Sequence, residues 1–311
     1  MIYSLIVQIK NRRWDYFPPK RSHPAYVISV GNLSAGGTGK TPMGLALVKW
    51  LEEKGLKVEV VLRGYGASQG FSDEAELYRK AVGEDGVHQE ADRVLALERM
   101  VSKEADIVLL DDAFQHRRVH RDLDLVLWDL SAPQGESEAL PLGLLREPMK
   151  GLERADAVVL TRSERVSEEE RERVCDTFKE RGWGEEQFLA SSQPLGLMEW
   201  PSGAPLEYDG EPCFLVSGIG RPEAFLITAK KMGLRIMGHH WFADHHPFSQ
   251  DDILNVWLEA EKAGAERIVL TSKDVVKWKG TRSVGVLEIE MKVEEGFWPW
   301  LQEKMEVARD E

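Results

Sequence analysis

The feature that most constrains the fold of this chain is the segment ISVGNLSAGGTGKTPM, residues 28–43, in which a short apolar run passes into glycines. Glycine loses more backbone entropy on folding than other residues, so glycines at 31, 36, 37 and 39 require a structural reason. The pattern before them predicts a strand over 26–30, and the pattern after Lys40 predicts a helix. A strand, a glycine loop and Gly-Lys-Thr at a helix N-terminus form a P-loop, whose backbone N–H groups and helix dipole bind phosphate.

This P-loop predicts a nucleotide site and part of a metal site. Lys40 is expected to contact the β- and γ-phosphates of ATP, and the Thr41 hydroxyl is expected to bind Mg²⁺. Ser34 stands where the standard spacing has its first glycine, so the motif is a GGTGKT variant. The predicted nucleotide-binding residues are Ser34, Ala35, Gly36, Gly37, Thr38, Gly39, Lys40 and Thr41.

A second motif supplies the carboxylates that a P-loop metal needs. In ADIVLLDDAFQH, residues 107–110 have the pattern of a buried parallel strand, and Asp111 and Asp112 follow at its carboxyl end. Parallel sheets bind ligands at that end of their strands. Thr41, Asp111 and Asp112 are therefore the predicted metal ligands.

Short β-branched runs alternate with amphipathic stretches along the chain. This alternation predicts an α/β fold of the P-loop NTPase type, with a mostly parallel sheet and helices on both faces. The predicted strands are 26–30, 58–62, 107–110, 123–128 and 157–161, and the predicted helices follow Lys40 and occupy about 73–82, 90–103 and 167–181.

A second series of strands and helices begins after a polar stretch that contains several Pro and Gly residues. The expected organisation has four parts. They are an N-terminal segment over 1–23, a P-loop kinase domain over 24–190, a linker over 191–212 and a smaller α/β domain over 213–311.

Charge excludes one class of partner and distinguishes one end of the chain. The net charge of −13 argues against nucleic-acid binding, which needs a basic face. Residues 1–23 instead carry five Lys or Arg, one Asp and many apolar and aromatic side chains, without an apolar run long enough to span a bilayer. Composition alone leaves open an interfacial segment on an anionic membrane and a helix packed on the body. Cys175 and Cys213 lack CxxC spacing, which fits a reducing cytoplasm.

Together these motifs resemble one family, the tetraacyldisaccharide 4'-kinases, which are the lipid A 4'-kinases of Gram-negative bacteria. The resemblance extends over most of the chain. The matching segments are VISVGNLSAGGTGKTP, RGYG at 63–66, DEAELY at 73–78, LDDAFQHRRVHRDLDLVL at 110–127, PLGLLREP at 141–148, ADAVVLT at 155–161, SGIGRP at 217–222, FADHHPF at 242–248 and LTSKDVVK at 270–277.

The resemblance implies transfer of the ATP γ-phosphoryl group, with Mg²⁺, to the 4'-hydroxyl of a tetraacylated, 1-phosphorylated glucosamine disaccharide. It implies action at the cytoplasmic face of the bacterial inner membrane. A lipid substrate is met in the headgroup region, so the resemblance favours peripheral membrane contact by residues 1–23. It leaves the oligomeric state open.

The resemblance also implies a catalytic pair, which maps to Asp73 in SDEAELY and His245 in ADHHP, acting with Lys40. A carboxylate and an imidazole can accept the proton of a sugar hydroxyl as it attacks. The chain departs from the family pattern at Ser72 and Ala113, where glycines are usual, and in a shorter stretch between RGYG and Asp73.

Three further residues, Arg63, Gln115 and His116, are candidate substrate contacts. Arg63 follows a predicted strand on the same sheet edge as the P-loop, and a solvated turn residue is the open alternative. His116 also fits a hydrogen-bonding role around the acidic turn.

Other functions stay open from the residues alone. HHWFADHH at 239–246 offers imidazoles and Asp244 as metal ligands, but its spacing matches no standard zinc motif. A P-loop GTPase or ATPase switch, or a metallochaperone-like module, would use hydrolysis to change shape. TSKD at 271–274 has its lysine one place late for the usual guanine-reading element. A soluble small-molecule kinase or ligase would show no dependence on lipid.

Overall fold

The computed structural model describes residues 13–34, 36–63, 72–132, 143–184 and 186–310. The predictions for residues 1–12 and for Ala35 therefore lie outside the described residues. The chain divides into two compact units. The first holds Met1–Tyr65, Tyr78–Ser192 and Met291–Glu311, and the second holds Gly66–Leu77 and Gln193–Glu290.

Most elements belong to one unit. Those of the first are β1 (Tyr26–Asn32), α2 (Lys40–Glu53), β2 (Val58–Leu62), η1 (Glu84–Gly86), β3 (Val87–Gln89), α4 (Arg93–Arg99), β4 (Ile107–Asp111), β5 (Leu123–Asp129), η3 (Met149–Arg154), β6 (Ala157–Thr161), η4 (Ser163–Arg165), α5 (Glu168–Arg181) and α9 (Phe297–Asp310). Those of the second are β8 (Pro205–Leu206), β9 (Pro212–Ser217), α6 (Pro222–Lys231), β10 (Arg235–Trp241), α7 (Gln250–Lys262), β11 (Arg267–Thr271) and α8 (Ser272–Val275). The boundary falls within α3 (Asp73–Val82), β7 (Glu186–Trp200) and β12 (Val284–Val293).

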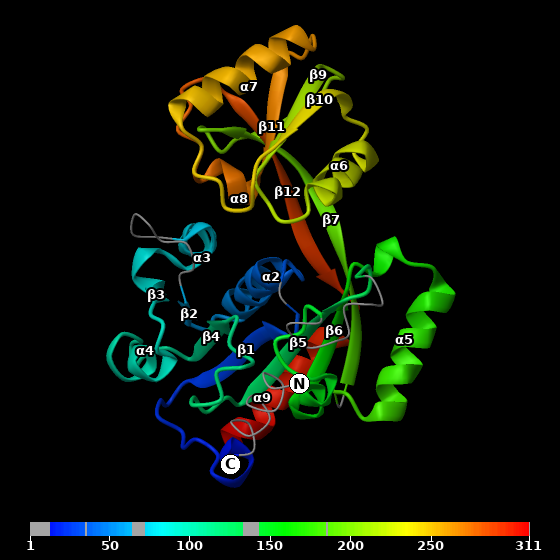
Figure 1. Cartoon of the computed structure of the whole chain (residues 1–311). Coiled ribbons are helices and arrows are strands. Elements are labelled where there is room, and N and C mark those ends of the chain that lie inside the picture. The colour runs from blue at the N-terminus through cyan, green and yellow to red at the C-terminus, as the bar shows by residue number, and fades with distance from the viewer. Residues whose placement is uncertain (1–12, 35, 64–71, 133–142, 185, 311) are drawn as a thin grey trace. The chain divides into compact units, whose positions relative to one another are not determined.

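The strands of the first unit form a parallel sheet in the order β7-β6-β5-β1-β4-β2-β3 (Figure 1). β1 lies at its centre, with Val27 opposite Val108 of β4 and Ser29 opposite Asp124 of β5. The short apolar runs in the sequence are these strands, because parallel strands are buried on both faces. The predicted α/β fold with a mostly parallel sheet is confirmed.

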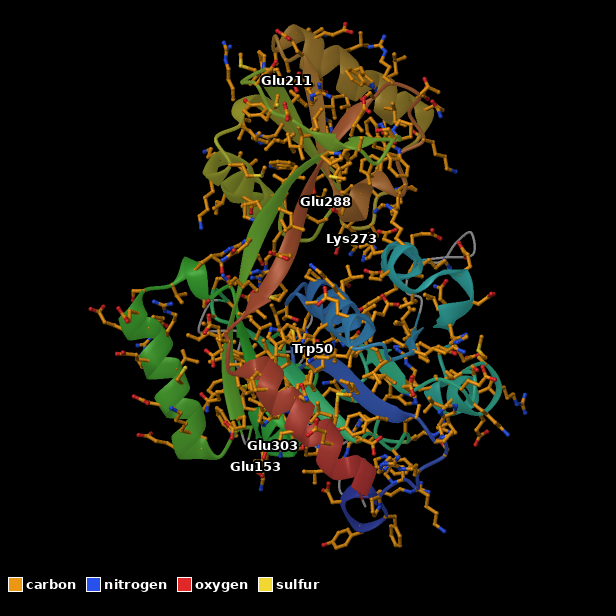
Figure 2. All side chains as sticks on the ribbon, turned by 180° about the vertical axis from the view of Figure 1, so that it is seen from behind. Trp50, Glu153, Glu211, Lys273, Glu288 and Glu303 are labelled. Atoms are coloured by element: carbon orange, nitrogen blue, oxygen red, sulfur yellow. The ribbon has the colours of Figure 1, made fainter. Side chains whose placement is uncertain are left out.

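Both faces of β1 are buried, as its alternating side chains show. Val27 packs in a cluster with Leu97 of α4, while Ile28, on the other face, is fully buried as well. Each such aliphatic side chain contributes about 1.5–3 kcal/mol of hydrophobic stabilisation. Trp50 of α2, labelled in Figure 2, stacks on Trp298 of α9 with ring centroids 5.4 Å apart.

The second unit has its own parallel sheet, in the order β10-β9-β11-β12. Alternate side chains of β9 enter two different cores. Phe214 packs in a cluster with Ile253 of α7, and Leu215 packs in a cluster with Phe225 of α6. The two helices therefore cover opposite faces of this sheet, as Figure 1 shows.

Some elements differ in extent from the sequence patterns. The helix expected over 90–103 is shorter, because Asp92 caps its start by accepting a hydrogen bond from the Val94 N–H, and two successive N–H groups, of Met100 and Val101, share the Ala96 carbonyl at its end. The stretch 191–212 holds the end of β7, which pairs antiparallel with β8. No described helix combines the length and apolarity needed to cross a membrane.

Gly31 generates a prediction about stability. A Cβ at this position would lie 2.5 Å from the Phe114 Cβ and 2.9 Å from its backbone nitrogen, neither of which can move easily. We expect Gly31→Ala to lower the free energy of unfolding by about 1–3 kcal/mol, measured by urea denaturation. Gly37→Ala is the matched control, because a Cβ there meets nothing within 4 Å. Equal stability of the two variants would contradict this packing.

Candidate active site

The glycine loop joins β1 to the first turn of α2. Gly39 is the residue before the helix and has φ 96°, a left-handed conformation that L side chains rarely adopt. Gly36 has φ 125°. These angles explain two of the glycines in the motif. The loop places Lys40 and Thr41 in the first turn of α2, where orphan N–H groups and the helix dipole favour an anion.

Lys40 lies against the acidic turn that follows β4. Its Nζ is 3.3 Å from Asn32 Oδ1 and 3.6 Å from Asp112 Oδ1. Arg146 Nη1 donates to both Asp112 oxygens, at 2.8 and 3.0 Å. Burial by itself would raise the pKa of the Asp112 carboxyl, but Lys40 and Arg146 outweigh it, so this pKa lies below its ordinary value. Asp112 is thus ionised at neutral pH.

The acidic turn is held in an uncommon backbone conformation. Asp112 has φ 51°, in the left-handed region, and Asp111 is buried at the end of β4. Arg93 is one of the largest fully buried side chains, and its Nη2 donates to the Asp111 carbonyl at 3.1 Å. Burial lowers the pKa of Arg93, and the charges of Asp112 and Asp111 oppose that shift. This guanidinium fixes the turn from inside.

The end of β6 supports the loop from its other side. Thr161 Oγ1 donates to the Thr38 carbonyl at 2.9 Å, and Arg162 Nη2 donates to the Gly37 carbonyl at 2.6 Å. Arg162 also forms an ion pair with Asp129 at the end of β5. The carbonyls of Gly37 and Thr38 are thereby held by side chains from the end of β6.

Gln115 and His116 follow the acidic turn. Gln115 Nε2 donates to the Asn32 carbonyl at 2.8 Å and to Glu147 Oε1 at 3.0 Å, so it connects the end of β1 to a buried carboxylate. Glu147 also pairs with Arg154 at 2.9 Å. Burial, and then the nearby Arg93, lowers the pKa of His116 to about 4, so its ring is neutral at pH 7. The Gln115 side chain thus joins the turn to β1 and to Glu147.

The second unit brings Asp73 and His245 together, although they are 172 positions apart in the sequence. His245 Nδ1 lies 3.2 Å from Asp73 Oδ2. His245 has φ 62°, and its N–H donates to the Gly218 carbonyl at 2.9 Å. Its Nε2 lies 3.4 Å from Lys273 Nζ. An ammonium can only donate, so in a hydrogen bond with Lys273 the Nε2 atom accepts, and Nδ1 is then the nitrogen that donates to Asp73.

The neighbouring histidines have other partners. His240 pairs with Glu259 at 2.8 Å, His246 pairs with Asp252 at 3.0 Å, and His239 stacks on Trp241. Within the described ranges of the chain, no group of three or more His, Cys, Asp or Glu side chains is placed to hold a metal ion. The described residues therefore give the metal-site alternative for 239–246 no support.

Comparison with known proteins decides the family. Residues 1–306 match the family described as LpxK: Tetraacyldisaccharide-1-P 4'-kinase. The chain belongs to this family.

Two LpxK relatives, both described as tetraacyldisaccharide 4'-kinase, come from Syntrophus aciditrophicus and Syntrophobacter fumaroxidans. They are 36% and 34% identical, over 87% and 94% of this chain and 81% of each relative. Among solved structures, LpxK from Aquifex aeolicus in complex with ATP aligns with a TM-score of 0.71 and 25% identity, over 99% of this chain and 96% of that one. The predicted family is thus confirmed.

The structure brings several predicted site residues of this LpxK family member together. Lys40 and Asp112 are neighbours, as are Asp73 and His245, while Arg63 lies exposed at the end of β2. Sequence reasoning assigned no role to several side chains that complete these groups: Asn32, Arg93, Arg146, Glu147, Arg162, Lys273 and Lys277. Their place in the sequence could have marked them as candidates, because most of them follow a strand or lie in one of the motifs quoted above.

His116 generates a prediction about pH. Its pKa in the fold is about 4, whereas in the unfolded chain it is about 6.5, so the unfolded state takes up a proton first as the pH falls. We expect the free energy of unfolding to fall by about 1–2 kcal/mol between pH 6.5 and 4 from this group, after discounting for its partial exposure. Denaturation at several pH values measures this slope, and His116→Asn should flatten it. An unchanged slope in the variant would show that another group causes the pH dependence of the free energy of unfolding.

Proposed function

We propose that this chain transfers the γ-phosphoryl group of ATP to the 4'-hydroxyl of a tetraacylated glucosamine disaccharide 1-phosphate, in lipid A biosynthesis. Membership of the LpxK family supports the donor and the acceptor. The observation that carries the proposal is the 3.2 Å contact between Asp73 and His245, because a carboxylate and an imidazole so placed can take a proton from an alcohol.

ATP is the proposed donor. The loop over Ser34–Thr41 supplies backbone N–H groups at the start of α2, and the Lys40 ammonium supplies the charge that the β- and γ-phosphates need. Arg162 and Thr161 hold the loop carbonyls of Gly37 and Thr38, which keeps those N–H groups aligned. The ATP complex of the Aquifex aeolicus relative supports the same donor here.

Mg²⁺ is the proposed metal. The oxygen donors of Thr41, Asp111 and Asp112 suit a hard cation, and Asp112 is ionised beside Lys40. When bound, the ion would neutralise charge on the β- and γ-phosphates. Arg146 holds both oxygens of Asp112 and so fixes the direction in which that carboxylate faces.

Asp73 and His245 are the proposed catalytic residues. Lys273 at Nε2 and Asp73 at Nδ1 set the tautomer and direction of the His245 ring. As the 4'-oxygen attacks the γ-phosphorus, its proton passes to Asp73, the bond from that phosphorus to the β–γ bridging oxygen breaks, and ADP leaves. The side chain of His245 is 38% exposed, which leaves its ring accessible to a sugar.

A guanine-dependent switch fits this chain less well. TSKD would need its aspartate to face a base, but Asp274 is fully buried. Its carboxylate accepts from Thr271 Oγ1 at 2.7 Å and from Ser217 Oγ at 3.0 Å. Lys273 is engaged with Glu74 at 2.9 Å.

The lipid substrate and the membrane surface are the proposed partners, at the cytoplasmic face of the bacterial inner membrane. Residues 13–16 are helical, and the aromatic side chains of Tyr16 and Phe17 are 79% and 72% exposed. Aromatic rings beside Lys20 and Arg21 have the composition of a segment that binds an anionic bilayer surface. Residues 1–23 are thus proposed to contact the membrane peripherally.

The direct test supplies radiolabelled ATP and the detergent-dispersed acylated disaccharide 1-phosphate, with separation by thin-layer chromatography. Label in the lipid product supports the proposed function. Label only in inorganic phosphate would identify a hydrolase, and transfer to a small soluble sugar alone would identify a different kinase.

Lys40→Ala and Asp112→Ala should each lower kcat by about 10²–10⁴-fold, because each removes charge stabilisation of the transferring phosphoryl group. The labelled-lipid assay under saturating substrates measures this loss. Lys49→Ala is the matched control, since Lys49 is exposed on the same helix. Normal turnover of Lys40→Ala would exclude this loop as the phosphate site.

Asp73→Ala and His245→Ala should lower kcat by about 10²–10⁴-fold while the KM for ATP changes by less than about threefold, because these side chains act on the acceptor. Steady-state kinetics with each substrate varied separates the two constants. His239→Ala, an exposed histidine on β10, is the control. Full activity of His245→Ala would move the proton-accepting role to other residues.

A further inference from the structure

Lys277 makes a close contact with the proposed base. Its Nζ donates a 2.7 Å hydrogen bond to Asp73 Oδ2, the same oxygen that faces His245 Nδ1. The two side chains are only 14% and 10% exposed, so this is not a solvated surface ion pair. A charge-assisted hydrogen bond in such surroundings is short and directional. Lys277 therefore constrains where the Asp73 carboxylate points.

Lys277 is itself held in place by a rigid group. Its Nζ lies 3.8 Å from Oδ1 of Asp274, whose side chain is fully buried. Asp274 is fixed by three donors, Thr271 Oγ1 at 2.7 Å, Ser217 Oγ at 3.0 Å and the Gly218 N–H at 3.1 Å. Lys277 thus lies between a fixed carboxylate and the proposed base.

The same buried aspartate also supports His245. Gly218 donates its N–H to Asp274 and accepts the His245 N–H at its carbonyl, at 2.9 Å. Asp274 therefore supports both groups that contact Asp73 Oδ2. It supports the His245 imidazole through Gly218, and it lies next to the Lys277 ammonium. In this way Asp274 helps to fix the relative position of Asp73 and His245 through the residues that lie between them.

Lys273 serves a different group. This residue of α8, labelled in Figure 2, has its Nζ 2.9 Å from Glu74 Oε1 and 3.4 Å from His245 Nε2. Lys273 therefore contacts the His245 imidazole and Glu74, not Asp73. The two lysines are thus distinguishable by substitution, since one contacts each member of the pair.

We propose that Lys277 is the positioning residue for Asp73. Both hydrogen bonds that the described residues make to this carboxylate fall on Oδ2, so Oδ1 is the oxygen left to accept the proton of the acceptor hydroxyl. Loss of the ammonium lets the carboxylate rotate, and the proton transfer then has a longer or misdirected path. The inference rests on the proposed function, in which Asp73 is the base.

The test compares Lys277→Met, Lys277→Arg and Asp73→Asn with a double variant, Lys277→Met with Asp73→Asn. Single-turnover transfer of label to the disaccharide, with enzyme in excess, keeps slow variants measurable. Lys279→Met is the matched control, because Lys279 is exposed two positions further on. Thermal unfolding of each variant shows whether it is folded.

We expect Lys277→Met to lower the single-turnover transfer rate by about 10- to 100-fold, with less than about a twofold change in the ATP concentration that gives half the maximal rate. Lys277→Arg should keep most of the rate. In the Asp73→Asn background, Lys277→Met should lower the transfer rate by less than about twofold, because the carboxylate that Lys277 positions is already absent. If Lys277 had only a structural role, Lys277→Met would lower the transfer rate by the same factor in both backgrounds.

Three results would overturn the proposal: a folded Lys277→Met variant at the wild-type rate, an arginine variant as slow as the methionine one, or an undiminished loss in the Asp73→Asn background. Failure of the wild-type chain to label the disaccharide is a separate result, because it rejects the proposed function itself.

Discussion

Parallel pairing of buried strands places the carboxyl ends of β1, β4 and β6 at one edge of the first sheet, and the groups proposed to handle phosphate leave from that edge. The P-loop follows β1, the acidic turn follows β4, and Arg162 follows β6. The second sheet repeats the constraint, since Gly218 follows β9, His245 comes shortly after β10 and Lys273 follows β11. Backbone hydrogen bonding between the strands therefore sets the spacing, within each unit, of the side chains proposed to act in phosphoryl transfer.

Charge compensation is the second requirement, because an ionised group withdrawn from water is costly unless it is paired. Asp112 has two cations, Lys40 and Arg146, and its pKa is lowered despite burial. Asp274 shows the opposite balance. Burial raises its pKa, while Thr271, Lys277 and its other partners act against the rise. The carboxylate proposed to meet the metal is thus kept ionised, and the carboxylate that anchors the second unit relies on donated hydrogen bonds.

Local sequence was sufficient to predict the fold class, the P-loop and the acidic turn, because each depends on a strand followed at once by residues with special backbone or chemistry. It did not predict β7 as a strand of 15 residues, because Pro194 and Gly196 interrupt its pattern and many of its side chains are only half-buried. Arg146 and Lys277 escaped assignment for another reason. Their partners are distant in the sequence, and only the folded chain shows that these long side chains reach Asp112 and Asp73.

Two of the residues proposed for chemistry, Asp112 and His245, share the left-handed backbone described above, with φ 51° and 62°. Such a conformation costs a non-glycine residue about 1 kcal/mol or more, and glycine adopts it without that cost. The backbone at both positions would therefore accept glycine more readily than the side chain that is present. The stability given up at these two positions is the cost expected of placing the proposed acid and imidazole there.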